Sequence, residues 1–339
     1  MSKSPGGSEE TGEGLVVPAR PGAAGGAATP SFGLPAGSDP GLPGQPAATR
    51  IGPRLFEWGD RTFVMGILNV TPDSFSGDGL LGGAAAGRET VASAVRLGTA
   101  MVADGADILD IGGESSRPGH LAVDADEETG RILPVLRALR EALPQTPLSL
   151  DTTKPEVAEA ALEAGADLIN DVWGVSPSDE MLRLAAAHAT PIVLMHNRSE
   201  PRYTNLIAEV LADLQAAIER ALKAGVDWDR IVVDPGFGFG KTPDHNLALL
   251  RSLDSLRVLE RPVLLGTSRK STLGKVLDLP PDERLEATLA TTALAIASGV
   301  DIVRVHDVRP NVRAARMADA IIRGAAVRPR EVKMPGDVP

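Results

Sequence analysis

Eight short apolar runs alternate along the chain with longer stretches in which Ala, Leu, Glu and Arg recur at helical spacing, such as residues 156–164 and 206–224. Near-continuous apolar strands that alternate with helices are typical of a parallel sheet covered by helices on its faces. Eight such units within residues 51–325 predict an α/β protein with a (β/α)8 TIM barrel, and a doubly wound open sheet is the alternative. The expected strands are residues 64–69, 107–112, 147–152, 168–173, 191–196, 231–236, 262–267 and 301–306.

The two ends of the chain lack this pattern. Gly and Pro make up 19 of the first 50 residues, and such a segment buries too little apolar surface to offset the entropy of ordering. We predict a disordered tail over residues 1–50, whose removal leaves activity and the thermal midpoint nearly unchanged, and a C-terminal tail over 326–339. Between the first tail and the barrel, RLFEWGDRTFVM (54–65) predicts a short hairpin with its turn at Gly59 and Asp60.

A repeated pattern marks where helices pass into strands. The segments DGADILDIG, AGADLINDV, AGVDWDRIVVD and SGVDIVRVHD each end a helix with Gly and then enter an apolar strand. The Asp residues that follow the Gly lie at the N-terminal ends of strands. In a barrel this end serves stability, so these residues are excluded from the site: Asp107, Asp167, Asp227 and Asp301.

Composition and charge exclude several classes of site and partner. The 339 residues include no cysteine, which excludes disulfides and thiolate zinc sites and fits a reducing, cytoplasmic environment. The net charge of −11 argues against nucleic acid as a partner. No apolar run approaches the roughly 18 residues of a membrane helix, so no membrane partner is expected.

Polar side chains stand at the opposite, C-terminal ends of nearly every expected strand, where the active sites of such barrels lie. The set comprises Asn69, Asp110, Glu114, Ser116, Arg117, Asp151, Asn170, Asp171, His196, Asp234, Thr267 through Lys270, Arg304 and His306. Its cations suit a phosphate or diphosphate. Asp151, Asn170 and Asp234 suit the N–H donors of a planar heterocycle. Asn69 offers a neutral oxygen to a Mg²⁺ ion that keeps its waters and shares phosphate oxygens.

The stretch DPGFGFGKT (234–242) is not a Walker phosphate loop, because its glycines alternate with phenylalanines instead of following the GxxxxGK[ST] spacing. We interpret it as the exit of the sixth strand, with Asp234 facing the site and glycines that permit close backbone approach. One phenylalanine can lie against a flat ligand. The alternative is that both phenylalanines pack against helices.

Eight blocks of the sequence together resemble dihydropteroate synthase. They occur in the order of that family and cover residues 54–325: MGILNVTPDSFS (65–76), DIGGESSRPG (110–119), SLDTTKPEV (149–157), INDVWG (169–174), LMHNR (194–198), DPGFGFGK (234–241), GTSRKS (266–271) and RVHDV (304–308). The resemblance implies a transferase of folate synthesis that joins 6-hydroxymethyl-7,8-dihydropterin diphosphate to 4-aminobenzoate and releases diphosphate. It also implies a homodimer.

The resemblance assigns roles by motif. Asn69 would meet Mg²⁺, and Asp151, Asn170, Asp234 and Lys270 would bind the pterin. Ser116, Arg117, Arg304 and His306 would hold the diphosphate and line its junction with aminobenzoate. The aminobenzoate pocket would draw on Ser116, Pro118, Phe239, Lys270 and Ser271, and the catalytic group would comprise Asp110, Arg117, Lys270, Arg304 and His306.

Two other functions fit parts of this pattern. The pterin-binding methyltransferase domains of corrinoid-dependent systems would retain Asp151, Asn170 and Asp234, but they do not need SSRPG and SRKS around a diphosphate. A non-catalytic pterin-binding paralogue would be favoured by loss of Lys270, Arg304 or His306, and all three are present.

Overall fold

The structure is a computed structural model that describes residues 45–70, 84–114 and 123–324, with the backbone alone for residues 84–87. Eight parallel strands form one sheet in the order β8-β7-β6-β5-β4-β3-β10-β9, and an isolated parallel bridge between Val233 and Val263 joins its two edges. The predicted (β/α)8 barrel is therefore confirmed, and the open sheet is wrong. The strands are β3 (Phe63–Asn69), β4 (Ile108–Gly112), β5 (Leu148–Asp151), β6 (Leu168–Asp171), β7 (Ile192–Met195), β8 (Ile231–Asp234), β9 (Leu264–Leu265) and β10 (Ile302–Val305).

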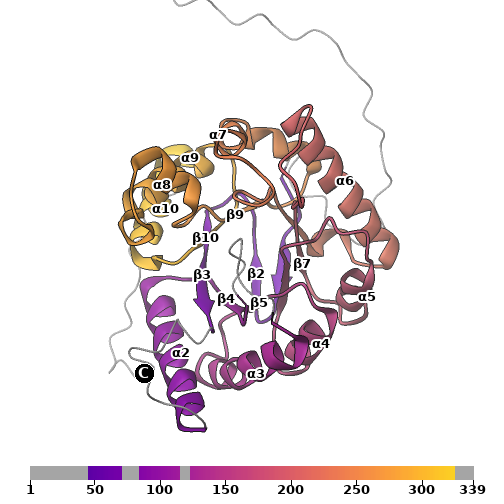
Figure 1. Ribbon diagram of the computed structural model, residues 1–339, viewed down its shortest axis with the longest axis vertical. Coiled ribbons are helices and arrows are strands. Elements are labelled where there is room, and N and C mark those ends of the chain that lie inside the picture. Colours follow the sequence, from indigo (N-terminus) through magenta and orange to yellow (C-terminus); the bar gives the residue numbers. More distant parts are fainter. Residues whose placement is uncertain (1–44, 71–83, 115–122, 325–339) are drawn as a thin grey trace, which may run out of the picture. The chain divides into compact units, whose positions relative to one another are not determined.

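Helices surround these strands on all sides (Figure 1). They are α2 (Ala84–Asp104), α3 (Ala125–Ala142), α4 (Pro155–Glu163), α5 (Glu180–Ala187), α6 (Leu206–Ala224), α7 (Pro243–Arg251), α8 (Ser271–Leu277), α9 (Leu285–Ala297) and α10 (Val308–Ile322), with 3-10 turns η1 (Trp228–Arg230), η2 (Leu253–Leu259) and η3 (Pro281–Glu283). In α6, Asn205 caps the first turn by accepting from the Ala208 N–H at 3.2 Å, and Gly225 ends the helix with φ of 99°. Among the described residues, no helix combines the length and apolar composition that crossing a membrane requires.

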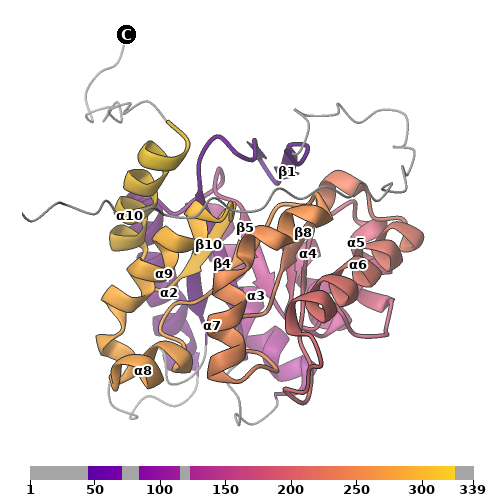
Figure 2. The ribbon, with the colours of Figure 1, turned by 90° about the horizontal axis from the view of Figure 1, so that it is seen from above.

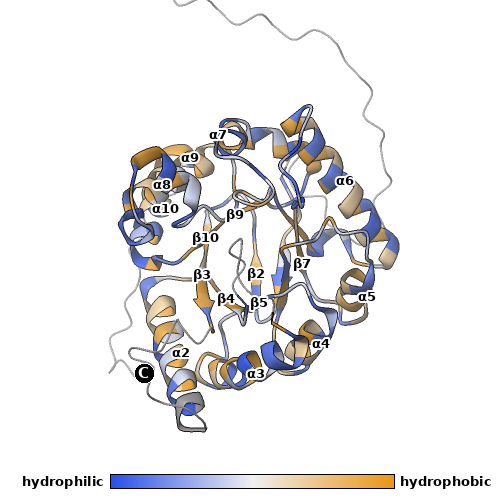
Figure 3. Ribbon diagram, viewed as in Figure 1, coloured by the Kyte–Doolittle hydropathy of each residue, from blue (hydrophilic) through white to orange (hydrophobic). Residues whose placement is uncertain are grey.

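The strands bury two separate apolar layers, because alternate residues of a strand point to opposite faces. One layer lies between the sheet and the helices, whose faces alternate between apolar and polar (Figure 3). The other lies inside one end of the barrel. Its strand residues are Phe63, Met65, Ile108, Leu168, Val193, Val232, Leu264 and Ile302.

An antiparallel hairpin of β1 (Thr49–Ile51) and β2 (Arg54–Phe56) lies at one end of the barrel, opposite the end that carries α8 (Figure 2). Phe56 packs on Phe63 with ring centroids 4.7 Å apart, and Trp58 meets Phe63 edge to face at 5.4 Å. The hairpin was predicted, but its turn lies at Gly52 and Pro53 rather than at Gly59 and Asp60. The reason is tertiary: Phe63, expected in the second arm, instead pairs with Ile302 in the barrel.

The first strand also corrects the boundary of the predicted tail. Thr49 is fully buried, donates to the Asp229 carbonyl at 2.6 Å and accepts from Trp58 Nε1 at 3.0 Å. Residues 45–50 therefore belong to the folded unit, while residues 1–44 and 325–339 lie outside the described residues.

Two truncations separate these segments. Deleting residues 1–44 is expected to leave the free energy of unfolding nearly unchanged. Deleting residues 1–50 removes Thr49 and leaves the buried Trp58 N–H without its acceptor, which costs about 1–3 kcal/mol. Urea denaturation of both proteins is the measurement, and equal stability of the two would contradict the role of Thr49.

Three of the four aspartates at the N-terminal ends of strands have the structural role expected of them, whereas the exposed Asp227 pairs with the nearby Arg230 at 3.2 Å. Asp107 pairs with Arg61 at 2.7 Å and accepts from the Val64 N–H at 2.9 Å. Asp301 accepts from the Val263 N–H at 2.9 Å, and Asp167 pairs with Arg140. These carboxylates tie neighbouring strands together at the N-terminal end of the barrel, away from the C-terminal strand ends where the site was predicted.

Candidate active site

The inside of the barrel turns polar two residues beyond its apolar layer. Because side chains alternate along a strand, the residue two places after a buried inward-facing one also faces inward. Asp110 follows Ile108 in this way, and Arg304 follows Ile302. The sequence thus places a polar layer directly above the apolar layer, at the C-terminal ends of the strands: Asp110, Asp151, Asn170, Asp234 and Arg304.

Arg304 joins two of these carboxylates. Its Nε lies 2.5 Å from Asp110 Oδ2, and its terminal nitrogen lies 2.6 Å from Asp151 Oδ2. Asn170 Nδ2 also donates to Asp110 Oδ2 at 3.0 Å. Asp110 is fully buried, and among the described residues nothing hydrogen-bonds its other oxygen, Oδ1. A buried acceptor without a donor is costly, so the site is suited to a ligand that supplies an N–H.

Burial shifts the titration of the groups around Arg304. It raises the pKa of Asp151 to about 7 against the opposing attraction of Arg304, and it also raises the pKa of Asp234. It lowers the pKa of Lys270 to about 8, and the negative charge of Asp234 opposes that change. Perturbed groups of both signs gathered in one place are a mark of a functional site.

A cavity of 260 Å³ opens beside this cluster. Eight of the residues predicted for the site line it: Asn69, Phe239, Ser268, Arg269, Lys270, Ser271, Arg304 and His306. Phe239 faces the cavity, whereas Phe237 is fully buried in the core, so one phenylalanine of the loop packs and the other is available to a ligand. Lys270 Nζ lies 4.5 Å from the centroid of the Phe239 ring.

Ser268 orients His306, a contact that sequence reasoning did not identify. The hydroxyl of Ser268 accepts from the His306 backbone N–H at 3.1 Å, and it lies 3.0 Å from His306 Nδ1. Since its oxygen already accepts, its proton can be donated to Nδ1, which favours the tautomer with the proton on Nε2. Arg284 was missed as well; it lines the cavity and donates to the Arg269 carbonyl at 2.9 Å.

Three residues that were expected to face the site instead form contacts with other parts of the protein. His196 is fully buried and points outward to Asp213, because it follows the inward-facing Met195 by one place. Asp171 is displaced in the same way and accepts from the Trp173 N–H at 2.9 Å. Arg269 lines the cavity, but it forms a bidentate pair with Asp307 at 2.5 and 2.9 Å, so its charge is largely compensated.

The remaining residues predicted for the site belong to the loops after the first two barrel strands. Ser116, Arg117 and Pro118 lie outside the described residues, as does the TPDSFSGDGLLGG segment up to residue 83. Glu114, at the last described position before the second loop, pairs with Lys154, which also bonds Glu128 at 2.6 Å. The base of that loop is therefore fixed to α3 and the start of α4.

The donors available to a metal ion are sparse. The described residues contain no cluster of three His, Cys, Asp or Glu side chains that could enclose a metal. Asn69 lines the cavity and brings a neutral side-chain oxygen to it. One neutral oxygen fits a Mg²⁺ ion that keeps its waters and shares oxygens with a phosphate ligand.

Comparison with known proteins agrees with the geometry of the site in pointing to a pterin-binding enzyme. Residues 65–306 match the family described as pterin binding enzyme. The chain is 46% identical over 275 residues to a dihydropteroate synthase of Clostridium beijerinckii, covering 81% of this chain and 99% of that one, and 47% identical to that of Bacillus subtilis, covering 81% and 94%.

Solved structures agree. The Xanthomonas albilineans dihydropteroate synthase with 4-aminobenzoic acid superposes with a TM-score of 0.75 at 42% identity, covering 81% of this chain and 97% of that one. The same enzyme in complex with 7,8-dihydropteroate gives 0.73 at 40% identity, with coverage of 81% and 98%. By sequence and by fold, the chain belongs to the dihydropteroate synthase family of pterin binding enzymes.

Proposed function

We propose that the cavity beside Arg304 is where this chain performs the reaction of its family, the condensation of 6-hydroxymethyl-7,8-dihydropterin diphosphate with 4-aminobenzoate. The observation that carries the proposal is the buried Asp110–Arg304–Asp151 cluster, in which Asp110 Oδ1 has no donor among the described residues. A pterin edge carries amino and ring N–H donors that complement such acceptors.

The pterin is bound by the deep acceptors. Asp151, Asn170 and Asp234 accept from or orient the heterocycle, and Lys270 contributes a cation at its rim. Burial of these groups supports the assignment, since a closed polar site makes each hydrogen bond count more than in water. Arg304, held by both Asp110 and Asp151, fixes the position of the carboxylates before the ligand arrives.

The diphosphate is held by Arg304 and His306, with Ser116 and Arg117 from the second loop. The bond between the pterin methylene carbon and the diphosphate oxygen breaks, and its electron pair leaves with the diphosphate, whose growing charge the cations neutralise. The electron-rich dihydropterin stabilises the positive methylene that remains. The aminobenzoate nitrogen then bonds to this carbon and releases a proton.

Aminobenzoate is positioned by Phe239, Lys270 and Ser271, with Ser116 and Pro118. The first three line the same cavity as His306, which supports an arrangement where the amine faces the leaving diphosphate. Water would consume the positive methylene, so the pocket has to exclude it. The apolar ring of Phe239 contributes to that exclusion.

Mg²⁺ would be held by Asn69 together with diphosphate oxygens, and when bound it would offset charge on the leaving group. Chelation with EDTA is expected to abolish diphosphate release, and Mg²⁺ to restore it. Asn69→Ala is expected to raise the half-saturating Mg²⁺ concentration severalfold with little change at saturation. An unchanged Mg²⁺ dependence would remove Asn69 from the metal site.

The decisive assay is diphosphate release from the pterin substrate, with and without 4-aminobenzoate. A dihydropteroate synthase releases diphosphate in step with aminobenzoate consumed, and 7,8-dihydropteroate accumulates. A non-catalytic binder would hold the pterin without release, and a corrinoid-dependent methyltransferase would not use aminobenzoate. Either result would overturn the proposal.

A homodimer in the cytoplasm completes the proposed function. Large apolar side chains are exposed on the neighbouring helices α8, α9 and α10 (Figure 1), where a second copy would cover them. They are Val276, Leu277, Leu294, Met317, Ile321 and Ile322. Light scattering at micromolar concentration measures the mass directly. The absence of cysteine supports the cytoplasmic location.

A further inference from the structure

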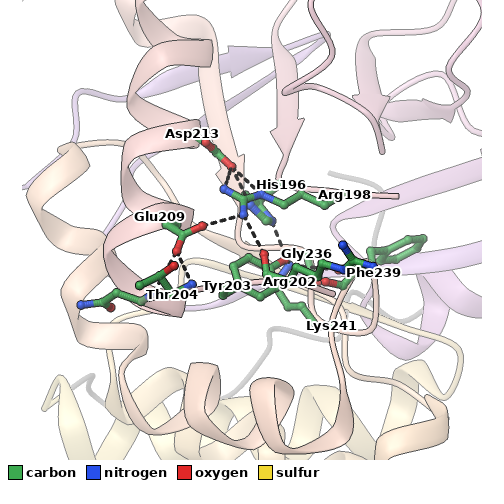
Figure 4. A network of polar contacts seen from close by, with 12 residues as sticks. His196, Arg198, Arg202, Tyr203, Thr204, Glu209, Asp213, Gly236, Phe239 and Lys241 are labelled. Carbon is green, nitrogen blue, oxygen red and sulfur yellow. Dashed lines mark hydrogen bonds and ion pairs between the residues drawn. The ribbon is translucent and has the colours of Figure 1, made fainter. Parts of the chain in front are cut away.

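The segment from Gly236 to Gly240, here termed the glycine loop, lines the cavity with Gly238 and Phe239, and it also meets a partly buried polar network around His196 and Lys241 (Figure 4). Side chains hold four of its five carbonyl groups. Lys241 Nζ donates to the carbonyls of Gly236 and Phe239 at 3.0 and 3.1 Å. Lys270 donates to that of Phe237, and Tyr203 to that of Gly240 at 2.8 Å. Such a loop is fixed by its neighbours rather than by secondary structure.

Lys241 is itself fixed by His196. The third contact of its Nζ is His196 Nδ1 at 2.9 Å, and His196 Nε2 lies 3.1 Å from Asp213 Oδ2 on α6. An ammonium has only donors, so Nδ1 must accept and Nε2 must carry the proton that is donated to Asp213. Arg198 also donates to Asp213 Oδ2, at 2.7 and 3.0 Å. The chain Asp213–His196–Lys241 thus has one consistent arrangement of protons.

Burial agrees with a neutral His196. It lowers the pKa of His196 to about 4, helped by the charge of Lys241, so the imidazole is neutral at physiological pH. Burial also lowers the pKa of Lys241 to about 7, which opposes the ammonium form. The three acceptors favour its ammonium form, because each of the three N–H bonds then has a partner.

The glycine loop has no room to move toward this network. A Cβ at Gly236 would lie 1.8 Å from the His196 carbonyl oxygen, and one at Gly240 would lie 2.3 Å from the carbonyl oxygen of Arg198. Both glycines have positive φ, of 70° and 54°. The loop therefore packs directly against the residues that follow β7, and Lys241 ties it there.

On its other side the same loop sets the geometry of the cavity. The Gly236 N–H donates to Asp234 Oδ1 at 2.7 Å. Phe239 lines the cavity, and its ring centroid lies 4.5 Å from Lys270 Nζ. A shift of the loop would displace Asp234, Phe239 and Lys270 together. None of Asp213, His196 and Lys241 lines the cavity itself.

We infer that Lys241, held by His196 and Asp213, is a positioning residue that sets the pterin and aminobenzoate pocket through the glycine loop. The inference rests on the proposed function of that pocket. Lys241 touches neither substrate and acts by fixing two carbonyl groups of the loop, so its loss alters substrate affinity in a protein that remains folded.

Lys241→Met tests this, since methionine fills a similar volume without donors. The KM for the pterin diphosphate and the dissociation constant for the pterin, from calorimetry, are expected to rise about tenfold or more, because small displacements of catalytic groups have effects of this size. Lys223→Met, at an exposed position in the last turn of α6, serves as the matched control and should leave both values unchanged.

A pair of variants at His196 provides the second test. The Asn side-chain oxygen of His196→Asn can replace Nδ1 as an acceptor for Lys241, whereas His196→Leu cannot. We expect His196→Leu to raise the pterin dissociation constant like Lys241→Met and His196→Asn to restore most of the affinity. Should Lys241→Met not fold, this pair decides the question.

The outcomes are distinguishable. If the wild type releases diphosphate and binds pterin while Lys241→Met and His196→Leu match its affinity and KM and only melt earlier, Lys241 is merely structural and the inference fails. If His196→Asn and His196→Leu lose affinity equally, the link through Nδ1 fails. If the wild type itself does not bind pterin, the proposed function fails, and this inference with it.

Discussion

Arg304→Met is expected to lose about a thousandfold in diphosphate release, the largest effect of any single substitution in the cavity. The guanidinium is placed to stabilise the leaving diphosphate and to hold Asp110 and Asp151 in position. Methionine fills much of the space but supplies neither charge nor N–H. The two carboxylates then face each other in a buried site, and folding should lose about 3–5 kcal/mol as well.

Stability and catalysis can be separated in a double variant. Arg304→Met with Asp110→Asn removes one of the two carboxyl groups that have lost their partner, so it should recover part of the lost stability while turnover stays low. Arg137→Met, an exposed site on α3, is the control for a lost arginine. Urea denaturation and the diphosphate assay are the measurements. Near-normal turnover in the folded single variant would refute the role of Arg304.

Asp151→Asn is expected to weaken pterin binding by about 2–4 kcal/mol, because an amide offers one acceptor oxygen and adds donors where the carboxylate offers two acceptors. The protein should still fold. Calorimetry with the pterin substrate or its product gives the affinity, and urea denaturation gives the stability. Unchanged affinity in the folded variant would exclude Asp151 from the pterin site.

The pKa of Asp151, raised by burial to about 7, adds a pH dependence with a definite sign. Above pH 7 the carboxylate is ionised and binds; below it, pterin affinity of the wild type should fall by up to about tenfold per pH unit. Asp151→Asn should lose this slope near pH 7. In the free protein the raised pKa favours the protonated form, so its contribution to stability declines as pH rises from about 4 to 7.

The barrel and its polar end were predictable from the sequence because both depend on local periodicity. Apolar runs of similar length, separated by helices, leave few alternatives to a parallel barrel. Asp110 and Arg304 were placed in the site because each lies near the C-terminal end of an expected strand. The structure shows that each also stands two places beyond a residue of the inner apolar layer, and a period of two preserves the facing side.

The errors have the same origin. His196 and Asp171 end their strands one place out of phase with the inward positions, and a continuous apolar run such as that of β7 does not reveal its phase. The partner of Arg269, Asp307, lies on the next βα unit, so only the tertiary structure brings them together. Lys241 could have been singled out as a lysine closing a glycine-rich loop, but its acceptors are backbone groups that no motif specifies.

The pairing of β3 with β10 has a consequence for how the chain is made. Phe63 meets Ile302, so the first barrel strand acquires one of its two neighbours only after every other barrel strand has been synthesised. Contacts of such long sequence separation form slowly, and an unpaired strand edge is open to other chains meanwhile. The aromatic contacts of Phe56 and Trp58 with Phe63 join residues that are adjacent in synthesis. These contacts can form before β10 has been synthesised, so the aromatic rings are able to cover the start of β3 before the barrel closes.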